Sequence, residues 1–199
     1  VTRLFKHQSV AIEAALSDSR QHVALSTGTS SGKSVCFNAP VLETLNADPY
    51  ALAMYLYPTK ALAQDQYGAL LALLGTEGGP LRQHVQPAVV DGDATFAERA
   101  RARESANIIL SNPDMLHASI LPQHTQWQRF LRGLRFVVID EAHVYRGIFG
   151  AHVAMVLKRL VRLCRHYGNS GLQFIYCSAT IANPQHHFKQ LIPLHALGG

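Results

Sequence analysis

Thr27-Gly28-Thr29-Ser30-Ser31-Gly32-Lys33-Ser34 is the stretch that decides the fold, because it directly follows the apolar run at residues 22–26. A strand that breaks into a glycine-rich loop and then enters a helix leaves backbone N–H groups without internal partners. These donors, together with the positive end of the helix dipole, form a binding site for phosphate. We therefore expect residues 27–34 to cradle a nucleotide, with Lys33 at the terminal phosphates and Ser34 on Mg²⁺. The strict form of this pattern has glycine where this chain has Thr27.

A second polar segment, Asp140-Glu141-Ala142-His143, follows residues 134–139, which are expected to form a buried strand. In a parallel sheet, ligands collect at the carboxyl ends of the strands, where both this segment and the glycine-rich loop fall. We expect Asp140 to hold Mg²⁺, usually through water, and Glu141 to orient or deprotonate the attacking water. An isolated acidic pair after a strand is usually a solvated turn, but the loop upstream favours catalysis. The sequence thus predicts a nucleoside triphosphatase with Lys33, Asp140 and Glu141 as catalytic residues.

The bulk composition is that of one globular α/β domain. The chain has 199 residues, of which 48% are hydrophobic and 16% charged, so disorder and a coiled coil are excluded. No apolar run reaches the roughly 18 residues of a membrane span, so we expect no membrane association. Cys36, Cys164 and Cys177 lie in apolar contexts, which favours reduced core thiols in a cytoplasmic protein. The chain begins Val1-Thr2 without a signal-like segment, as a domain taken from a longer protein would.

The net charge of +5 and the pI near 9.3 favour a polyanionic partner. Part of this charge lies between Lys158 and Arg165, at helical spacing. A solvated helix face explains that cluster adequately and is favoured over direct contact with nucleic acid. The histidines, including His186-His187, lack metal-ligand spacing and are expected at the surface or behind the site. Trp127 is better explained as a buried helix anchor than as a platform for base stacking.

Strands and helices alternate along the chain, which predicts an α/β fold with a mainly parallel sheet and helices on both faces. The expected strands cover residues 22–26, 51–57, 86–91, 107–110, 136–139 and 174–177. The expected helices cover residues 7–16, 33–45, 61–74, 94–105, 113–119, 126–132, 149–167 and 184–191. Five of the strands end in polar segments, which indicates that this edge of the sheet binds a long ligand as well as ATP.

Taken together, these segments resemble superfamily 2 helicases of the DEAD/DEAH-box type, in the first of their two RecA-like domains. Six motifs occur in order, at residues 27–34, 58–63, 92–93, 111–116, 140–143 and 178–180. Residues 144–153 look like the MrfA (YprA) branch of bacterial DNA-repair helicases and its fungal RecQ-like relatives. The resemblance implies that residues 1–199 form a single three-layer RecA-like P-loop NTPase domain. It would be the N-terminal motor domain of a longer parent, with the second RecA-like domain outside this chain.

The resemblance also implies roles for particular residues in binding and coupling. The side-chain amide of Gln8 would read the adenine edge, since a carboxamide offers both a donor and an acceptor. The segment Ser178-Ala179-Thr180, with His143, would couple the state of the γ-phosphate to domain closure. The cofactors would be ATP and Mg²⁺.

Single-stranded nucleic acid, with DNA favoured, is the implied partner besides the second RecA-like domain. Its backbone would be held by three groups of residues on the strand-end edge: Pro58, Thr59 and Lys60, then Gly92 and Asp93, then Asn112 and Pro113. Contacts from hydroxyls, N–H groups and a lysine to phosphates do not read bases, so sequence specificity is not expected. Asp93 and Asp114 have the wrong charge for phosphate and are interpreted as helix caps.

The implied function is that of an ATP-dependent DNA helicase or translocase in DNA repair, in the bacterial cytoplasm beside the nucleoid. A DEAD-box-type RNA helicase, a double-strand translocase and a non-hydrolysing ATP-dependent clamp remain as alternatives. In related enzymes an arginine from the second domain accelerates hydrolysis about 10³–10⁵-fold. We therefore expect the isolated domain to be weakly active or inactive.

Overall fold

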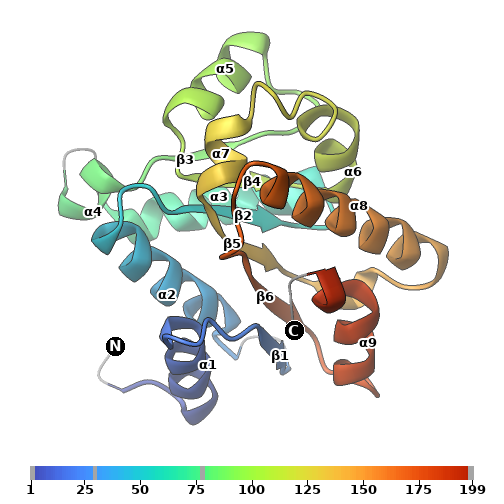
Figure 1. Ribbon diagram of the computed structural model, residues 1–199. Coiled ribbons are helices and arrows are strands. Elements are labelled where there is room, and N and C mark those ends of the chain that lie inside the picture. The colour runs from blue at the N-terminus through green and yellow to red at the C-terminus, as the bar shows by residue number, and fades with distance from the viewer. Residues whose placement is uncertain (1–2, 29–30, 77–78, 197–199) are drawn as a thin grey trace.

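The computed structural model describes residues 3–28, 31–76 and 79–196. Its centre is a six-stranded sheet in the order β1-β6-β5-β2-β4-β3, in which every pairing is parallel (Figure 1). The strands are β1 (Val23–Ser26), β2 (Leu52–Leu56), β3 (Pro87–Val89), β4 (Ile108–Ser111), β5 (Leu134–Ile139) and β6 (Gln173–Ser178). The predicted parallel α/β sheet is confirmed, and each predicted strand lies within two residues of the observed one at either end.

Helices cover both faces of the sheet, as predicted. They are α1 (Lys6–Leu16), α2 (Lys33–Ala47), α3 (Lys60–Leu74), α4 (Pro80–His84), α5 (Phe96–Ser105), α6 (Pro113–Met115), α7 (Gln128–Gly133), α8 (Gly147–His166) and α9 (Pro184–Leu191). A π-helical turn, η1 (Leu116–Ile120), continues α6, and short 3₁₀ turns form η2 (Ala142–Val144) and η3 (Leu194–Ala196). Figure 1 shows α1 and α2 on one side of the sheet and α8 and α9 on the other.

Alternation along the central strands builds two separate apolar cores. In β5, Phe136 and Val138 pack with α1, α2 and α3, whereas Val137 and Ile139 pack with α7, α8 and α9. All four side chains are 0% exposed, and each such burial contributes roughly 1.5–3 kcal/mol relative to exposure. A strand segment buried on both faces is apolar throughout, which is why residues 136–139 of β5 form a continuous hydrophobic run, whereas Arg135 near the start of the strand is half-buried.

Two local predictions differ from the structure. The expected helix at residues 113–119 divides into α6 and the π-helical η1, and α4 was not predicted. Trp127 is 2% exposed and packs edge-on against Phe130, so its interpretation as a buried anchor is confirmed. The three cysteines are buried and unpaired.

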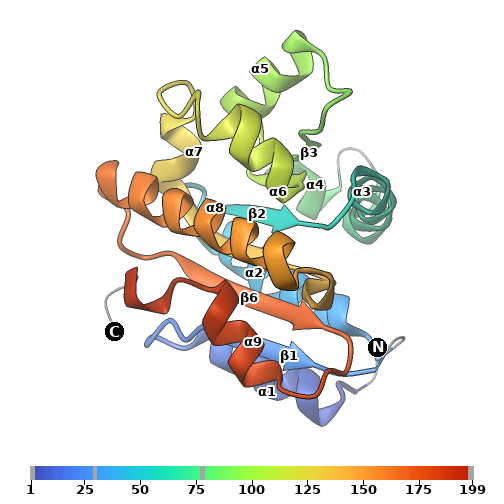
Figure 2. The same cartoon turned by 90° about the vertical axis from the view of Figure 1, so that its right-hand side faces the viewer.

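The parallel arrangement brings all six carboxyl ends to one edge of the sheet, which we call the strand-end edge. Figure 2 shows the arrowheads of β1, β2 and β6 pointing the same way. Within the described part of the chain, no helix is both long and apolar enough to cross a lipid bilayer.

Candidate active site

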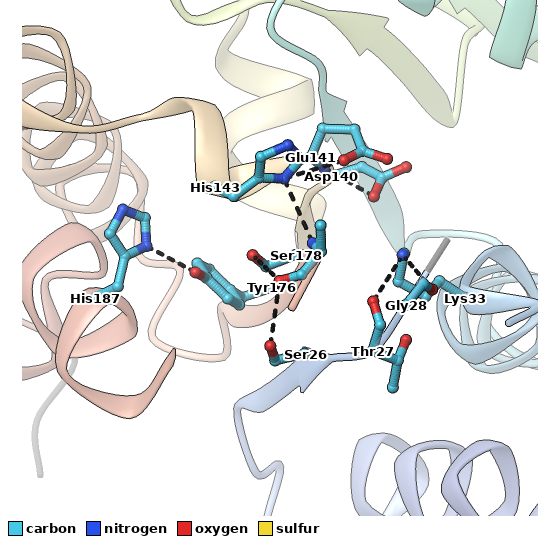
Figure 3. Close-up of polar contacts among 11 residues, drawn as sticks. Ser26, Thr27, Gly28, Lys33, Asp140, Glu141, His143, Tyr176, Ser178 and His187 are labelled. Atoms are coloured by element: carbon cyan, nitrogen blue, oxygen red, sulfur yellow. Dashed lines mark hydrogen bonds and ion pairs between the residues drawn. The ribbon is translucent and has the colours of Figure 1, made fainter. Parts of the chain in front are cut away.

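The glycine-rich loop leaves β1 and enters α2 at the strand-end edge. The Lys33 ammonium folds back over the loop and donates to the carbonyl oxygens of Thr27 and Gly28, at 3.1 and 3.0 Å (Figure 3). The Thr27 hydroxyl lies 2.7 Å from the Ser31 hydroxyl, which also donates to the Gly28 carbonyl. A phosphate oxygen would compete with these carbonyls for the ammonium, which carries three donors. Thr29 and Ser30, also predicted to bind nucleotide, lie outside the described residues.

Thr27 replaces the expected glycine without strain. Among the described non-glycine residues, only Arg20 and Glu141 have a positive φ, so position 27 needs no glycine backbone. Its N–H donates to the Ser178 carbonyl at 3.3 Å, which ties the start of the loop to the end of β6.

Gly32 is the position in this loop where glycine is required. It caps α2 in a left-handed conformation with φ 72°, and a Cβ there would lie 2.5 Å from Nε2 of Gln8. Gln8 is 5% exposed; its Oε1 accepts from the Phe5 N–H at 2.9 Å, and its Nε2 donates to the Gly32 carbonyl at 3.2 Å. Gln8 therefore packs directly against the turn that leads into Lys33.

The acidic pair follows β5 at the same edge. The Asp140 N–H donates to the Leu56 carbonyl at 3.1 Å, and its Oδ1 accepts from the Glu141 N–H at 2.8 Å. Burial raises the pKa of Asp140, while the Glu141 N–H and the positive charge of Lys33 oppose this rise. The Lys33 ammonium and the Asp140 carboxylate face each other in Figure 3. Lys33, Asp140 and Glu141, the three residues predicted as catalytic, thus lie together at the strand-end edge.

His143 links the acidic pair to the end of β6. Its Nδ1 lies 3.1 Å from Oε2 of Glu141 and 3.4 Å from the N–H of Ala179. A single ring nitrogen cannot donate to the carboxylate and accept from the amide at once, so the tautomer or charge of His143 selects one partner. The Ser26 and Ser178 hydroxyls both donate to the Ala179 carbonyl, at 3.2 and 2.8 Å.

Ser34 and Thr180 complete the set of residues predicted around the nucleotide. Ser34 lies in the first turn of α2 and is exposed, and Thr180 is exposed just beyond β6. Both side chains are accessible to a ligand at the strand-end edge.

A bridge through His187 was missed by the sequence interpretation. Its Nδ1 lies 2.7 Å from the Tyr176 hydroxyl, and its Nε2 lies 2.7 Å from the Tyr145 carbonyl. The bridge joins α9, β6 and the segment after the acidic pair, as Figure 3 shows in part. Gly150 packs so closely on the Tyr145 carbonyl that a Cβ would not fit. No local pattern signals contacts between residues 11 and 42 positions apart.

The residues proposed for nucleic acid lie on neighbouring strand ends, and two of them cap helices. Oγ1 of Thr59 accepts from the Leu62 N–H at 3.2 Å at the start of α3. Oδ1 of Asn112 accepts from the Met115 N–H at 2.8 Å, before Pro113 in the first turn of α6. Pro58 directly precedes the cap of α3.

The prediction that Asp93 and Asp114 cap helices is wrong. Thr95 caps α5, in reciprocal hydrogen bonds with Glu98, and Asn112 caps α6. Asp93 instead pairs with Lys60 at 2.6 Å, and its carboxylate holds the pKa of Lys60 above the ordinary value. The Thr95 hydroxyl and the Asn112 amide oxygen each accept from the N–H group three residues later, so the two carboxylates are not needed as caps.

Asp91 is the residue that organises the turn beside Gly92, and it was not predicted. It is 3% exposed. Its Oδ1 accepts from the N–H groups of Asp93 and Ala94, both at 3.0 Å, and its Oδ2 accepts from Gln64 at 2.9 Å. A buried carboxylate with three donors fixes the path of the chain between β3 and α5.

Comparisons with known proteins match nearly the whole chain. The model of the DEAD/DEAH box helicase family matches residues 5–188. The ATP-dependent helicase HRQ1 of Saccharomyces cerevisiae is 44% identical over 192 residues, which cover 96% of this chain and 18% of that protein. The helicase YprA of Bacillus subtilis, named as uncharacterized and ATP-dependent, is 42% identical over 191 residues, covering 96% of this chain and 25% of that protein.

Solved structures agree with these sequence matches. The crystal structure of the DUF1998 helicase MrfA superposes with a TM-score of 0.88 at 42% identity, covering 96% of this chain and 29% of that one. MrfA bound to DNA and AMPPNP gives 0.86 at 43% identity, covering 94% and 25%. The chain thus spans between 18% and 25% of the length of the two curated relatives named above.

Proposed function

The chain belongs to the DEAD/DEAH box helicase family, and from this membership we propose that it is the ATP-binding motor domain of an ATP-dependent DNA helicase or translocase that acts in DNA repair. The observation that carries the proposal is the convergence of Lys33, Asp140 and Glu141 at the strand-end edge. A cation on the phosphate loop, a metal-binding carboxylate and a water-orienting carboxylate are the parts that phosphoryl transfer requires.

The residues present fit Mg²⁺ and a triphosphate. Asp140 is half-buried beside Glu141, and burial raises its pKa, so the charge of Lys33 offsets the cost of its ionised form only in part. A divalent cation held by Asp140 and by the Ser34 hydroxyl would supply that charge. Bound there, Mg²⁺ neutralises charge on the transferring phosphoryl group. The N-terminus of α2, which begins at Lys33 after Gly32, would offer backbone N–H groups to the phosphates.

Glu141 is the residue proposed to orient the attacking water. Its left-handed backbone, φ 49°, turns the side chain away from the course of β5, and His143 holds one of its oxygens. When His143 accepts instead from the Ala179 N–H, Glu141 is released from that contact. The state of the carboxylate and the end of β6 are therefore linked through one ring nitrogen, which supports the proposed coupling role of residues 178–180.

DNA is the proposed track, and a second RecA-like domain of the parent is the proposed partner. The named relative MrfA has been solved with DNA and AMPPNP at 43% identity to this chain. The RNA-bound helicase Mss116 matches at 20% identity and supports the shared fold alone. A protein that works on the chromosome would lie beside the bacterial nucleoid in the cytoplasm. Single-stranded deoxyribo- and ribo-oligonucleotides of the same sequence, compared as activators of ATP turnover, distinguish the two tracks.

The central test is Glu141→Gln in the full-length protein. The variant keeps the size and polarity of the side chain but cannot take a proton from water, so ATP binding should persist while DNA-stimulated turnover falls at least about 100-fold. Binding is measured with a fluorescent ATP analogue and turnover by phosphate release. Unchanged turnover would reject the role of Glu141. Wild-type protein that binds ATP without any turnover would favour the clamp.

A further inference from the structure

A hollow with a volume of about 640 Å³ lies along the outer face of α8. Four cations line it, all from the second half of the helix: Lys158, Arg159, Arg162 and Arg165. His117 from η1 and His195 from η3 lie at its walls. Figure 2 shows α8 running across the sheet from the strand-end edge toward the opposite edge, so these cations lie away from the nucleotide residues.

The four cations of this α8 hollow are unpaired. Among the residues that the structure describes, none of them makes an ion pair or a side-chain hydrogen bond, and the hollow has no acidic side chain in its lining. Other arginines of this fold do have partners: Arg129 donates to the carbonyls of Arg103 and Ala106, and Arg135 donates to that of Gly171. The cations of the hollow therefore have donors in place for an outside anion.

The helix dipole does not account for the whole cluster. Cations in the last turn of a helix are stabilised by its negative end, which explains Arg165. Lys158 and Arg159 lie about two turns before the end of α8, beyond the reach of that effect. A solvated face would also be expected to carry charges of both signs, and this one carries only positive charge.

We propose that the α8 hollow binds the phosphate backbone of duplex DNA next to the single-stranded track, a proposal that rests on the motor function above. Residues 158–165 span about 10 Å of helix axis, over which one strand of a duplex presents about three phosphates. The strand-end edge and the hollow are joined by α6 and η1. Asn112, the cap of α6, lies on the strand-end edge, and His117 of η1 lines the hollow.

The lining favours a duplex over an unpaired strand or a protein. Proteins that grip single strands stack bases on aromatic rings, and no Phe, Tyr or Trp lines the hollow among the described residues. A row of cations along one helix suits the regularly spaced phosphates of a duplex backbone. An acidic protein segment would satisfy the same charges, so the experiment includes one.

The test compares two double variants of the full-length protein. Arg162→Ala/Arg165→Ala removes two charges from the hollow, and Arg132→Ala/Lys189→Ala removes two exposed charges from α7 and α9. Binding to a tailed DNA duplex and to the tail alone is measured by fluorescence anisotropy over a range of salt concentrations. The hollow variant should bind the tailed duplex more weakly, with a log–log salt slope smaller by about two, since each phosphate contact contributes about 0.9.

The control variant and Arg162→Lys/Arg165→Lys should keep the wild-type slope, because the first leaves the hollow intact and the second keeps its charge. ATP turnover stimulated by the tail alone should stay unchanged in the hollow variant, which shows an intact motor. An unchanged slope, or equal losses for tail and tailed duplex, would overturn the proposal. Poly-L-glutamate serves as the acidic polypeptide in the same assay, and a hollow variant that loses affinity for it alone would also overturn the proposal. Wild-type protein that binds neither DNA would reject the motor function itself.

Discussion

Asp140 ionises at a position where the fold stabilises charge poorly. Burial is the main cause of its raised pKa, and the Glu141 N–H only partly offsets it. Since the folded protein binds this proton more tightly than the unfolded chain does, the contribution of Asp140 to stability is greatest at low pH. It is lost as the pH rises from the ordinary pKa of 3.8 through the raised folded value. Near neutral pH the acidic site therefore destabilises the free protein.

Asp140→Asn should accordingly raise the melting temperature of the nucleotide-free protein at about pH 7 and leave it nearly unchanged near pH 3. Addition of Mg²⁺ and ATP should reverse the order, because only the wild-type carboxylate binds the ion. Differential scanning fluorimetry under the four conditions measures both effects. A variant that melts below wild type at neutral pH without nucleotide would contradict the destabilising effect assigned to the ionised Asp140 carboxylate.

Gly32 combines a left-handed backbone with a close neighbour. Gly32→Ala should destabilise the fold by about 1–2 kcal/mol from backbone conformation alone, and further because the methyl group meets Nε2 of Gln8. Gly147 has φ 56° with open space around it, so Gly147→Ala isolates the backbone effect. Urea unfolding should rank Gly32→Ala as clearly the less stable of the two. Equal losses would mean that Gln8 does not press on the loop.

At the scale of elements, α9 is fastened to the sheet by the His187 bridge. His187→Ala removes both hydrogen bonds and leaves the Tyr176 hydroxyl and the Tyr145 carbonyl without their partner, so a loss of about 1–3 kcal/mol is expected. Tyr176→Phe breaks only one bond and should cost about 1 kcal/mol. Chemical denaturation of the two variants gives the comparison. Identical stability of His187→Ala and wild type would show that α9 packs without the bridge.

The strands and most helices were predictable because each carries its own signal. Residues 136–139 form the apolar run that a strand buried on both faces needs, and α8, which begins at Gly147, keeps a regular apolar stripe. The order β1-β6-β5-β2-β4-β3 was not predicted, since pairing between distant strands leaves no mark in local composition. The caps of α5 and α6 were assigned to neighbouring carboxylates because Asp, Asn and Thr are all good caps and only geometry decides among them.

At the scale of the whole molecule, the described residues bring together two parts of the proposed catalytic centre. Its strand-end edge presents the phosphate loop and the acidic pair, and hydrolysis in related enzymes also needs a positive side chain from a second domain. The 199-residue chain alone should therefore turn over ATP about 10³-fold or more slowly than the full-length protein with DNA. Phosphate release from the two proteins at equal concentration measures the ratio. Rapid, DNA-stimulated turnover by the isolated chain would contradict this expectation.

The candidate site was predictable to the extent that its residues lie in contiguous segments. Lys33 and Asp140 were placed together because parallel strands end at one edge, and their facing side chains follow from that rule. His187 was missed because its contacts arise from tertiary packing alone. Asp91 was missed because its burial and its bond from Gln64 depend on packing, although its bonds to the N–H groups of Asp93 and Ala94 are local. The cationic row on α8 was visible in the sequence, but the hollow that it lines was not.

Gln8 braces the turn beneath the phosphates from behind, through the Gly32 carbonyl. If the same amide also binds adenine, then a bound base changes how firmly Gln8 holds the phosphate loop at Gly32. Different nucleobases would then change the rate of hydrolysis as well as the binding affinity. A bare tripolyphosphate would be a poor mimic of ATP even though it carries every charged group.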